Sequence, residues 1–271
     1  MKEYFMTFFN MAKKLLQIVL PEVIFNKIKK EHYYKVLKSF NIERESDLLI
    51  MKEFVAEGDF VIDIGANIGV YTKFLSEFVG VSGIVISIEP IPITYSFLLN
   101  DIKRMKLNNV KPYNIAIGEN KSISEMCIPV GVNGKNYYRA TMFNTENKEF
   151  KKGIEKIEVN LIPLDMLVNS LIRPISFIKI DVEGFELSVL KGAIKTLKKN
   201  KPSLLIEIDG NPAAIGTNAD DVLKFLRELN YEPYIFINGK LNRWKAGDLS
   251  VNYFFFNENH KQLLIDKGII S

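Results

Sequence analysis

The residues best suited to chemistry lie where a β-type apolar run meets a glycine-containing turn. The run Phe60–Ile64 leads into Gly65–Gly69 and then into a helix-like pattern. Glycine lets the backbone approach a ligand closely, and the following helix begins with unpaired N–H groups. A second apolar run ends on Glu89, 26 residues after Asp63, which is about the spacing at which an acidic residue reaches a ribose diol. Together these features predict a site for a nucleotide-like cofactor.

Four more acidic residues follow two later strand-like runs: Asp181 and Glu183, then Glu207 and Asp209. In open parallel sheets, ligands bind outside the carboxyl ends of the strands, so these carboxylates are expected to gather beside the glycine turn. Clustered carboxylates repel one another unless something positive or protic lies among them. Each one alone is explained as well by a helix cap or a solvated turn. The set predicts a functional site.

The acidic residues suit two kinds of catalytic role. Asp181, Glu183 and Glu207 are candidates for a base that takes a proton from a hydroxyl acceptor. Lys179 lies two residues before Asp181 on the same strand face, where it would orient or pair with that carboxylate, or serve as a paired structural lysine. Alternatively, Asp181 with Glu207 or Asp209 would offer oxygen ligands to Mg²⁺.

Length, charge and cysteine content limit the class of protein. The 271 residues are enough for one large α/β domain with an extension. Hydrophobic residues make up 47%, and the net charge of +4 is too small to argue for nucleic-acid binding. The single cysteine, Cys127, excludes an internal disulfide and a multi-cysteine zinc site. A reducing, cytoplasmic location is therefore expected.

The hydrophobic periodicity predicts alternating strands and helices, as in a doubly wound sheet. The predicted strands are 60–64, 84–89, 111–117, 122–130, 157–162, 175–180, 203–208, 232–237 and 251–256. The predicted helices are 44–56, 68–79, 93–107, 164–172, 184–199, 218–229 and a short one after 258. The strands 122–130 and 157–162 flank a polar stretch, so we expect a long hairpin with residues 131–153 as a lid or substrate loop.

Residues 1–43 are predicted to form a helical extension of a domain at 44–271. Residues 1–38 mix aromatic and aliphatic side chains with eight lysines and three glutamates. This pattern favours a helix packed on the domain with its lysines in water, and it also suits a helix on a membrane surface. No run reaches ~18 uninterrupted apolar residues, so any membrane contact would be peripheral.

Several segments share the order and spacing of one protein family. They are Asp63–Gly69, Ile88-Glu89-Pro90, Asn114–Gly118, Leu164-Asp165, and Ile178–Glu186 with Leu190-Lys191-Gly192. With these segments, residues 59 to 210 resemble the FkbM-type S-adenosylmethionine-dependent methyltransferases. The resemblance implies a class I methyltransferase fold, which is α/β and Rossmann-like. We therefore expect a doubly wound, mostly parallel sheet with an antiparallel C-terminal strand, an N-terminal helical extension and an inserted β-hairpin.

The resemblance also implies where S-adenosylmethionine would bind. Gly65, Asn67 and Gly69 would border its methionine part. Asp63 would hold the turn and the amino group, and Glu89 would take the ribose hydroxyls, since a carboxylate accepts two donors at once. The adenine would lie against four apolar residues, which are Pro90, Ile91, Ala116 and Ile117.

The implied reaction is methyl transfer, with O-methylation of a hydroxyl on a glycan, glycolipid or natural product as the expected chemistry. Positioning would supply most of the acceleration, because the methyl group is already activated. Two alternatives stay open. An NAD-dependent oxidoreductase should show a fuller glycine motif and a Tyr–Lys or His catalytic pair, and a non-catalytic module would be held at a membrane or a partner by residues 1–38. The sequence does not indicate the acceptor or the oligomeric state.

Overall fold

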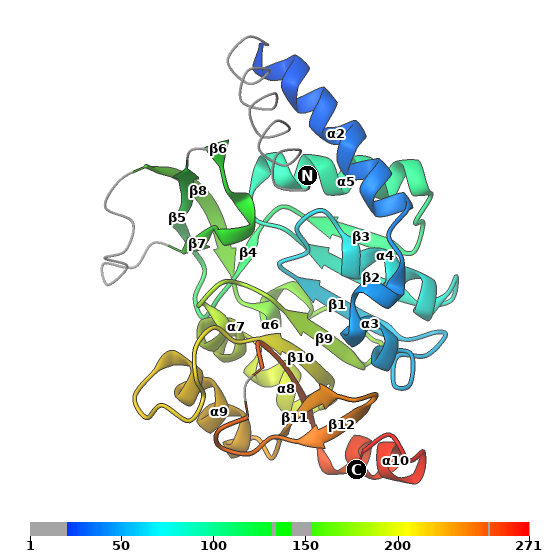
Figure 1. Cartoon of the computed structure of the whole chain (residues 1–271). Coiled ribbons are helices and arrows are strands. Elements are labelled where there is room, and N and C mark those ends of the chain that lie inside the picture. The colour runs from blue at the N-terminus through cyan, green and yellow to red at the C-terminus, as the bar shows by residue number, and fades with distance from the viewer. Residues whose placement is uncertain (1–20, 132–133, 143–152, 249, 271) are drawn as a thin grey trace, which may run out of the picture.

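The computed structural model describes residues 21–131, 134–142, 153–248 and 250–270, which form two sheets. The larger sheet contains β1 Phe60–Ile64, β2 Ile84–Ile88, β3 Val110–Tyr113, β9 Phe177–Ile180, β10 Ser203–Glu207, β11 Glu232–Ile237, β12 Lys240–Arg243 and β13 Asn252–Phe256. Their order is β12-β11-β13-β10-β9-β1-β2-β3 (Figure 1). The strands from β10 to β3 are parallel, and the chain order reverses between β1 and β9. Ligands of doubly wound sheets bind at such a switch point.

The C-terminal part of this sheet is antiparallel. Strand β13 lies between β10 and β11 and is antiparallel to both, which confirms the predicted antiparallel C-terminal strand. Strand β12 was not predicted, although its signal is in the sequence. It follows β11 through Asn238 and Gly239, which have φ values of 53° and 79°. An Asn-Gly pair with positive φ at both positions is typical of a two-residue hairpin turn.

Helices cover both faces of the sheet, and this explains why β1 is buried throughout. Ile62 packs in a core with one helical layer and Val61 in a core with the other. The first layer contains α6 Leu164–Leu167, α7 Glu186–Gly192, α8 Ile194–Asn200 and α9 Asn218–Glu228. The second contains α3 Ser46–Met51, α4 Val70–Val79, α5 Pro92–Met105 and α10 Glu258–Asp266.

Three predicted helices are shorter than expected. The predicted helix 44–56 is reduced to a 3-10 turn, η1 Ile42–Arg44, followed by α3, and the predicted helix 164–172 ends with α6. The predicted helix 184–199 is two helices, α7 and α8, which meet at Ala193. A Cβ on Gly192 would lie 2.0 Å from the carbonyl oxygen of Gly118, so this glycine allows α7 to approach the chain that follows β4.

The smaller sheet lies beside the carboxyl edge of the larger one (Figure 1). It contains β4 Ala116–Ile117, β5 Ser122–Gly131, β6 Gly134–Lys135, β7 Thr141–Met142 and β8 Ile154–Ile162. Strands β5 and β8 form the predicted antiparallel hairpin. The predicted strand 111–117 is divided, because β3 belongs to the larger sheet and β4 pairs with β8. Within the predicted lid, residues 134–142 form β6, η2 Tyr137–Arg139 and β7, and residues 143–152 lie outside the described part.

The helical extension packs on the domain through α2 Glu22–Lys38, which lies along α5 (Figure 1). The ring of Tyr33 lies 5.2 Å from that of Phe97, and Arg104 forms an ion pair with Glu31 at 2.8 Å. Leu37 is buried. The packed alternative therefore holds for the described part of the extension. Among the described residues, none of the helices has the length and apolar character needed to span a membrane.

Candidate active site

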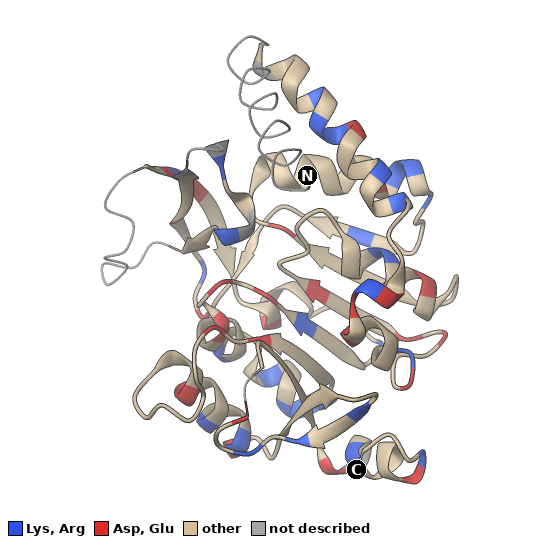
Figure 2. Cartoon of the chain, viewed as in Figure 1, with Lys and Arg blue, Asp and Glu red and all other residues tan. Residues whose placement is uncertain are grey.

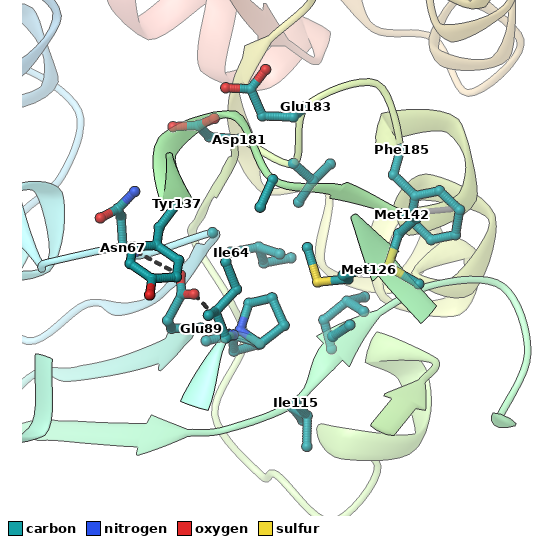
Figure 3. A pocket seen from close by; sticks show the side chains of 18 of the residues that line it. Ile64, Asn67, Glu89, Ile115, Met126, Tyr137, Met142, Asp181, Glu183 and Phe185 are labelled. Carbon is teal, nitrogen blue, oxygen red and sulfur yellow. Dashed lines mark hydrogen bonds between the residues drawn. The ribbon is translucent and has the colours of Figure 1, made fainter. Parts of the chain in front are cut away.

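A cavity of about 290 Å³ opens at the carboxyl ends of β1, β2, β9 and β10, where the smaller sheet meets the larger one. Figure 3 shows that polar side chains occupy separate parts of it, with Asp181 and Glu183 at one end and Glu89 near Asn67 at another. The remaining wall is mostly apolar. The lining residues are Ile64, Gly65, Asn67, Ile88, Glu89, Pro90, Ile91, Ile115, Ala116, Ile117, Met126, Tyr137, Ala140, Met142, Asp181, Val182, Glu183, Phe185 and Glu207.

Glu89 is the buried carboxylate of the cavity and lies directly after β2. Its Oε2 accepts the amide of Asn67 at 2.9 Å, and its Oε1 accepts the amide of Ile91 at 3.0 Å. Burial raises the pKa of Glu89 to about 7, although both amides act in the opposite direction. Each carboxylate oxygen keeps further acceptor capacity, so the side chain remains able to receive two hydroxyl donors from the cavity.

Asn114 holds the turn that carries Glu89, a role that the sequence prediction did not assign. Its side-chain amide donates to the carbonyl oxygens of Glu89 and Pro90, both at 2.9 Å. The residue stands between β3 and β4, where the chain passes from one sheet to the other. The resemblance had included Asn114 in a motif, and the spatial proximity to Glu89 supplies the physical reason.

The predicted cofactor residues in and before the glycine turn differ in whether they line the cavity. Gly65 and Asn67 line the cavity, whereas the described lining does not include Asp63 or Gly69. A Cβ on Gly65 would lie 1.8 Å from the carbonyl oxygen of Asp181, so this glycine makes room for the neighbouring strand end. A Cβ on Gly69 would lie 2.7 Å from a methyl group of Leu98, which packs from α5. Both glycines also have positive φ, at 79° and 91°.

The predicted adenine residues all line the cavity. Pro90, Ile91, Ala116 and Ile117 are joined there by Ile115, which the prediction omitted. Met126 in β5, Met142 in β7 and the nearby Ala140 continue this apolar wall, and Tyr137 of η2 also lines the cavity. The part of the wall formed by the four predicted residues and Ile115 suits a flat base. Tyr137, Ala140 and Met142 belong to the segment 131–153 that was predicted as a lid or substrate loop, whereas Met126 had no predicted role at the site.

Three of the predicted acidic residues meet at the other end of the cavity. Asp181, Glu183 and Glu207 all line it, from the segments that follow β9 and from the end of β10. Glu183 has a left-handed φ of 49°, and its carbonyl oxygen accepts the hydroxyl of Thr141 at 2.7 Å. This bond connects the acidic end with the smaller sheet. Asp209 is exposed and is not among the described lining residues.

Lys179 supplies the positive charge that this cluster requires. Its Nζ donates to Oδ2 of Asp181 at 3.0 Å and lies 3.7 Å from Oδ1 of Asp63. Burial favours the neutral amine, but the charges of Asp181 and Asp63 outweigh it, so the pKa of Lys179 is raised. The lysine therefore remains an ammonium between two carboxylates, as the pairing prediction required.

Glu183 and Glu207 share an environment that disfavours their ionised forms. Burial is the main cause that raises the pKa of Glu183 to about 7, and the negative charges of Asp181 and Glu207 add to it. Burial and the charge of Asp181 also raise the pKa of Glu207, against the opposing effect of Lys179. A carboxylate with a pKa of about 7, such as Glu183, is suited to exchange protons at physiological pH.

The magnesium prediction receives no support from this geometry. Within the described ranges there is no group of three or more His, Cys, Asp or Glu side chains arranged to hold a metal ion. Asp181 and Glu207 line the same cavity, but Asp209, the third predicted ligand, is not part of the described lining.

The chain was compared with families of known proteins. The model of the methyltransferase FkbM domain matches residues 63–233, which is more than half of the chain. The chain belongs to this family. Its α/β fold with a mostly parallel central sheet is that of a class I methyltransferase, as the resemblance implied. The match begins at Asp63 and ends at Pro233 in β11, so it includes every segment that lines the cavity.

Similar solved structures are distant in sequence. Methyltransferase FkbM from Methylobacillus flagellatus KT is 21% identical over 74% of this chain and 44% of that chain, with a TM-score of 0.47. The chain thus spans less than half of that protein. An S-adenosylmethionine-dependent O-methyltransferase from Thermotoga maritima is 15% identical over 78% of this chain and 63% of its own, with a TM-score of 0.43. No match was found among curated proteins.

The residues of the cavity fit S-adenosylmethionine, the cofactor that the resemblance implied. The buried Glu89 offers carboxylate oxygens for a diol, and an apolar wall that includes Pro90 and Ile115 lies next to it. The acidic end suits a ligand that carries positive charge. A structure of fibrillarin from Aeropyrum pernix, which contains natively bound S-adenosylmethionine, is 13% identical to this chain over 75% of its length and 67% of that chain, with a TM-score of 0.43.

Proposed function

We propose that this methyltransferase methylates a hydroxyl group of a glycan, glycolipid or natural product, with S-adenosylmethionine as the donor. The observation that carries the proposal is a single cavity with the buried Glu89 at one part and the carboxylates of Asp181, Glu183 and Glu207 at another. When bound, the cofactor supplies a methyl group that is already activated as a sulfonium. The side chains of the protein must hold the acceptor hydroxyl in line with this methyl group and accept the proton that the hydroxyl loses.

Asp181 is the residue best placed to receive or direct that proton. It lines the cavity at the end of β9, and its Oδ2 is fixed by the Lys179 ammonium at 3.0 Å. Its remaining carboxylate oxygen is available to accept a hydroxyl hydrogen bond. Glu183, with a pKa of about 7, is the second candidate for the base, because a base works best near the ambient pH.

The apolar and aromatic wall supports a carbon-rich acceptor. Met126 and Met142 line the cavity from β5 and β7, and Tyr137 lines it from η2. An aromatic ring offers a large apolar face with a polar tip, and methionine adapts to irregular shapes. A hydroxyl acceptor with an apolar face is therefore the class that this wall favours.

Binding and methyl transfer test the proposal in two steps. Calorimetry should show S-adenosylmethionine and its demethylated product binding with ~1:1 stoichiometry. Transfer of a labelled methyl group should then be measured on a panel of sugars, glycolipids and phenolic or aliphatic alcohols. Binding of NADH without binding of S-adenosylmethionine would restore the oxidoreductase alternative. Binding of the donor without transfer to any hydroxyl compound would favour the non-catalytic alternative.

A further inference from the structure

We propose that Asp63 is a positioning residue that acts on Asp181 through Lys179 and does not bind the cofactor. This inference rests on the proposed function, because Asp181 is assigned there to the acceptor hydroxyl. It differs from the sequence expectation, in which Asp63 would hold the amino group of the cofactor. The difference comes from where the structure puts the two oxygens of Asp63.

Asp63 is fully buried in β1, one residue before Ile64, which lines the cavity. Its Oδ2 accepts the hydroxyl of Thr72 at 2.6 Å, and the Thr72 oxygen lies 2.7 Å from the hydroxyl of Ser87, which is also buried. Since Thr72 uses its proton on Asp63, Ser87 is the donor of the second bond. This chain of hydroxyls fixes one side of the carboxylate from α4 and β2.

The other oxygen of Asp63 faces Lys179. Asp63 and Lys179 are directly paired across β1 and β9, so their side chains lie on the same face of the sheet. Oδ1 has no hydrogen-bond partner among the described residues, and its nearest cation is the Lys179 ammonium at 3.7 Å. A buried carboxylate oxygen without a hydrogen bond is costly, and the adjacent charge is what compensates it.

Lys179 is thereby held on three sides. Asp181 accepts its hydrogen bond at 3.0 Å, Asp63 attracts it from 3.7 Å, and the ring of Tyr71 lies 4.6 Å from its Nζ. A cation over an aromatic ring is stabilised by the ring electrons. A lysine side chain is flexible by itself, so these contacts turn it into a fixed support for the Asp181 carboxylate.

The arrangement explains why Asp63 belongs to the site without lining the cavity. Removal of its charge would leave Lys179 with one carboxylate partner and freedom to move, and Asp181 would lose its fixed orientation. The hydrogen bonds that hold Glu89 would be kept, because its carboxylate accepts the separate amides of Asn67 and Ile91.

The first test measures cofactor affinity of Asp63→Asn by calorimetry, beside the wild type and Glu89→Gln. Asp63→Asn should keep the affinity for S-adenosylmethionine within about threefold of the wild type, whereas Glu89→Gln should weaken it about tenfold or more. An Asp63→Asn affinity as poor as that of Glu89→Gln would mean that Asp63 holds the cofactor, and the inference would be overturned. If the wild type binds no S-adenosylmethionine, it is the proposed function that fails.

The second test measures the coupling of Asp63 to Lys179 from melting temperatures. Lys179→Met leaves Asp63 as a buried charge without a partner, and the double variant Asp63→Asn with Lys179→Met removes both charges. The double variant should therefore melt at a higher temperature than Lys179→Met alone. A double variant whose melting temperature is lower by the sum of the two single losses would show that the residues are independent.

The third test separates positioning from general stability. With a hydroxyl acceptor, Asp63→Asn should lower kcat about tenfold and leave the KM of S-adenosylmethionine unchanged. Asp101→Asn is the matched control, because Asp101 is likewise buried and has one carboxylate oxygen without a hydrogen bond among the described residues, but lies in α5 outside the cavity lining. Its kcat should equal that of the wild type. Equal losses of kcat in both variants would show that Asp63 contributes only to stability, and the inference would be overturned.

Discussion

Glu89 accepts the amide of Asn67 at 2.9 Å and so joins the end of β2 to the turn that follows β1. The carboxylate expected to bind the ribose is therefore also a fixed part of the backbone framework. Glu89→Ala should weaken S-adenosylmethionine binding by about 1.5–3 kcal/mol, the range for hydrogen bonds to a charged group. Calorimetry checks this, with Glu77→Ala as the control because Glu77 is exposed on α4. Unchanged affinity would remove Glu89 from the cofactor site.

The raised pKa of Glu89 predicts a pH dependence of binding. Its folded-state pKa of about 7 lies above the ordinary value of 4.5, so between these values the folded protein holds the extra proton. The stability that this proton contributes is lost as the pH rises through about 7. The ionised carboxylate is the better acceptor for two hydroxyls, so affinity for the cofactor should rise over the same interval. Glu89→Gln should flatten the profile in calorimetry at several pH values, and an unchanged slope in that variant would contradict the assignment.

Asn114 should affect binding without touching the ligand. Asn114→Ala removes both hydrogen bonds to the turn of Glu89 and Pro90, so the cofactor affinity should fall about tenfold. Asn109→Ala is the matched control, since the Asn109 amide also donates to two carbonyl oxygens, those of Ser76 and Gly80, away from the cavity lining. That variant should lose stability only. Equal affinities of the two variants would refute the role of Asn114.

Asp181 should be the acidic residue most important for turnover. Asp181→Asn keeps the size and hydrogen bonding of the side chain but removes its charge, so turnover should fall by ~10²-fold or more while cofactor affinity is retained. Glu183→Gln and Glu207→Gln should have smaller effects. The measurement is methyl transfer to a hydroxyl acceptor, repeated with a chelator and with added Mg²⁺. Loss of turnover on chelation would favour Asp181 as a Mg²⁺ ligand. Near-normal turnover of Asp181→Asn would exclude it both as a base and as a metal ligand.

We further propose that α2 contacts anionic membrane. Val23, Ile24 and Ile28 are 81%, 46% and 47% exposed on this helix, and the exposed Lys27 lies among them. Figure 2 shows further basic residues along α2. Apolar side chains beside lysines suit the surface of an anionic bilayer.

The membrane proposal is tested by vesicle sedimentation. Replacing the three apolar residues of α2 by serine should reduce sedimentation with anionic vesicles more than with neutral ones. Ile172→Ser with Ile215→Ser is the control, because both isoleucines are almost fully exposed elsewhere. Removing α2 altogether would uncover Phe97 in α5, so the substitutions are the cleaner comparison. Identical sedimentation of all variants would exclude a membrane role for this face.

The sequence was sufficient for the parts of the site that local patterns encode. The turn after β1, the carboxylate after β2 and the acids after β9 and β10 are each a strand end followed by a polar residue, and a parallel sheet brings strand ends together. The same alternation predicted a doubly wound sheet, and the order of its strands became known only from the structure. The antiparallel hairpin of β5 and β8 was visible as two flanking runs.

Other features depend on contacts between distant segments. Asp63 and Gly69 were predicted from the motif alone, and the motif does not show that Asp63 is paired with Lys179 across two strands or that Leu98 of α5 packs beside Gly69. The sequence pattern does not show that Met126 and Met142 line the cavity, because it is the pairing of β5 with β7 in the smaller sheet that brings them there. The division of the predicted strand 111–117 also depends on a distant segment, because β4 pairs with β8 of the smaller sheet and not with the larger sheet that contains β3.

The cavity is assembled from two sheets that meet at Asn114 and Ile115. The larger sheet supplies the carboxylates, and the hairpin sheet supplies Met126, Met142 and the neighbouring Tyr137. Substitutions in the hairpin can therefore change the shape and polarity offered to an acceptor while Glu89 and its backbone partners stay intact. For engineering, this makes the hairpin the element to randomise when a different acceptor is wanted and the donor is to be kept.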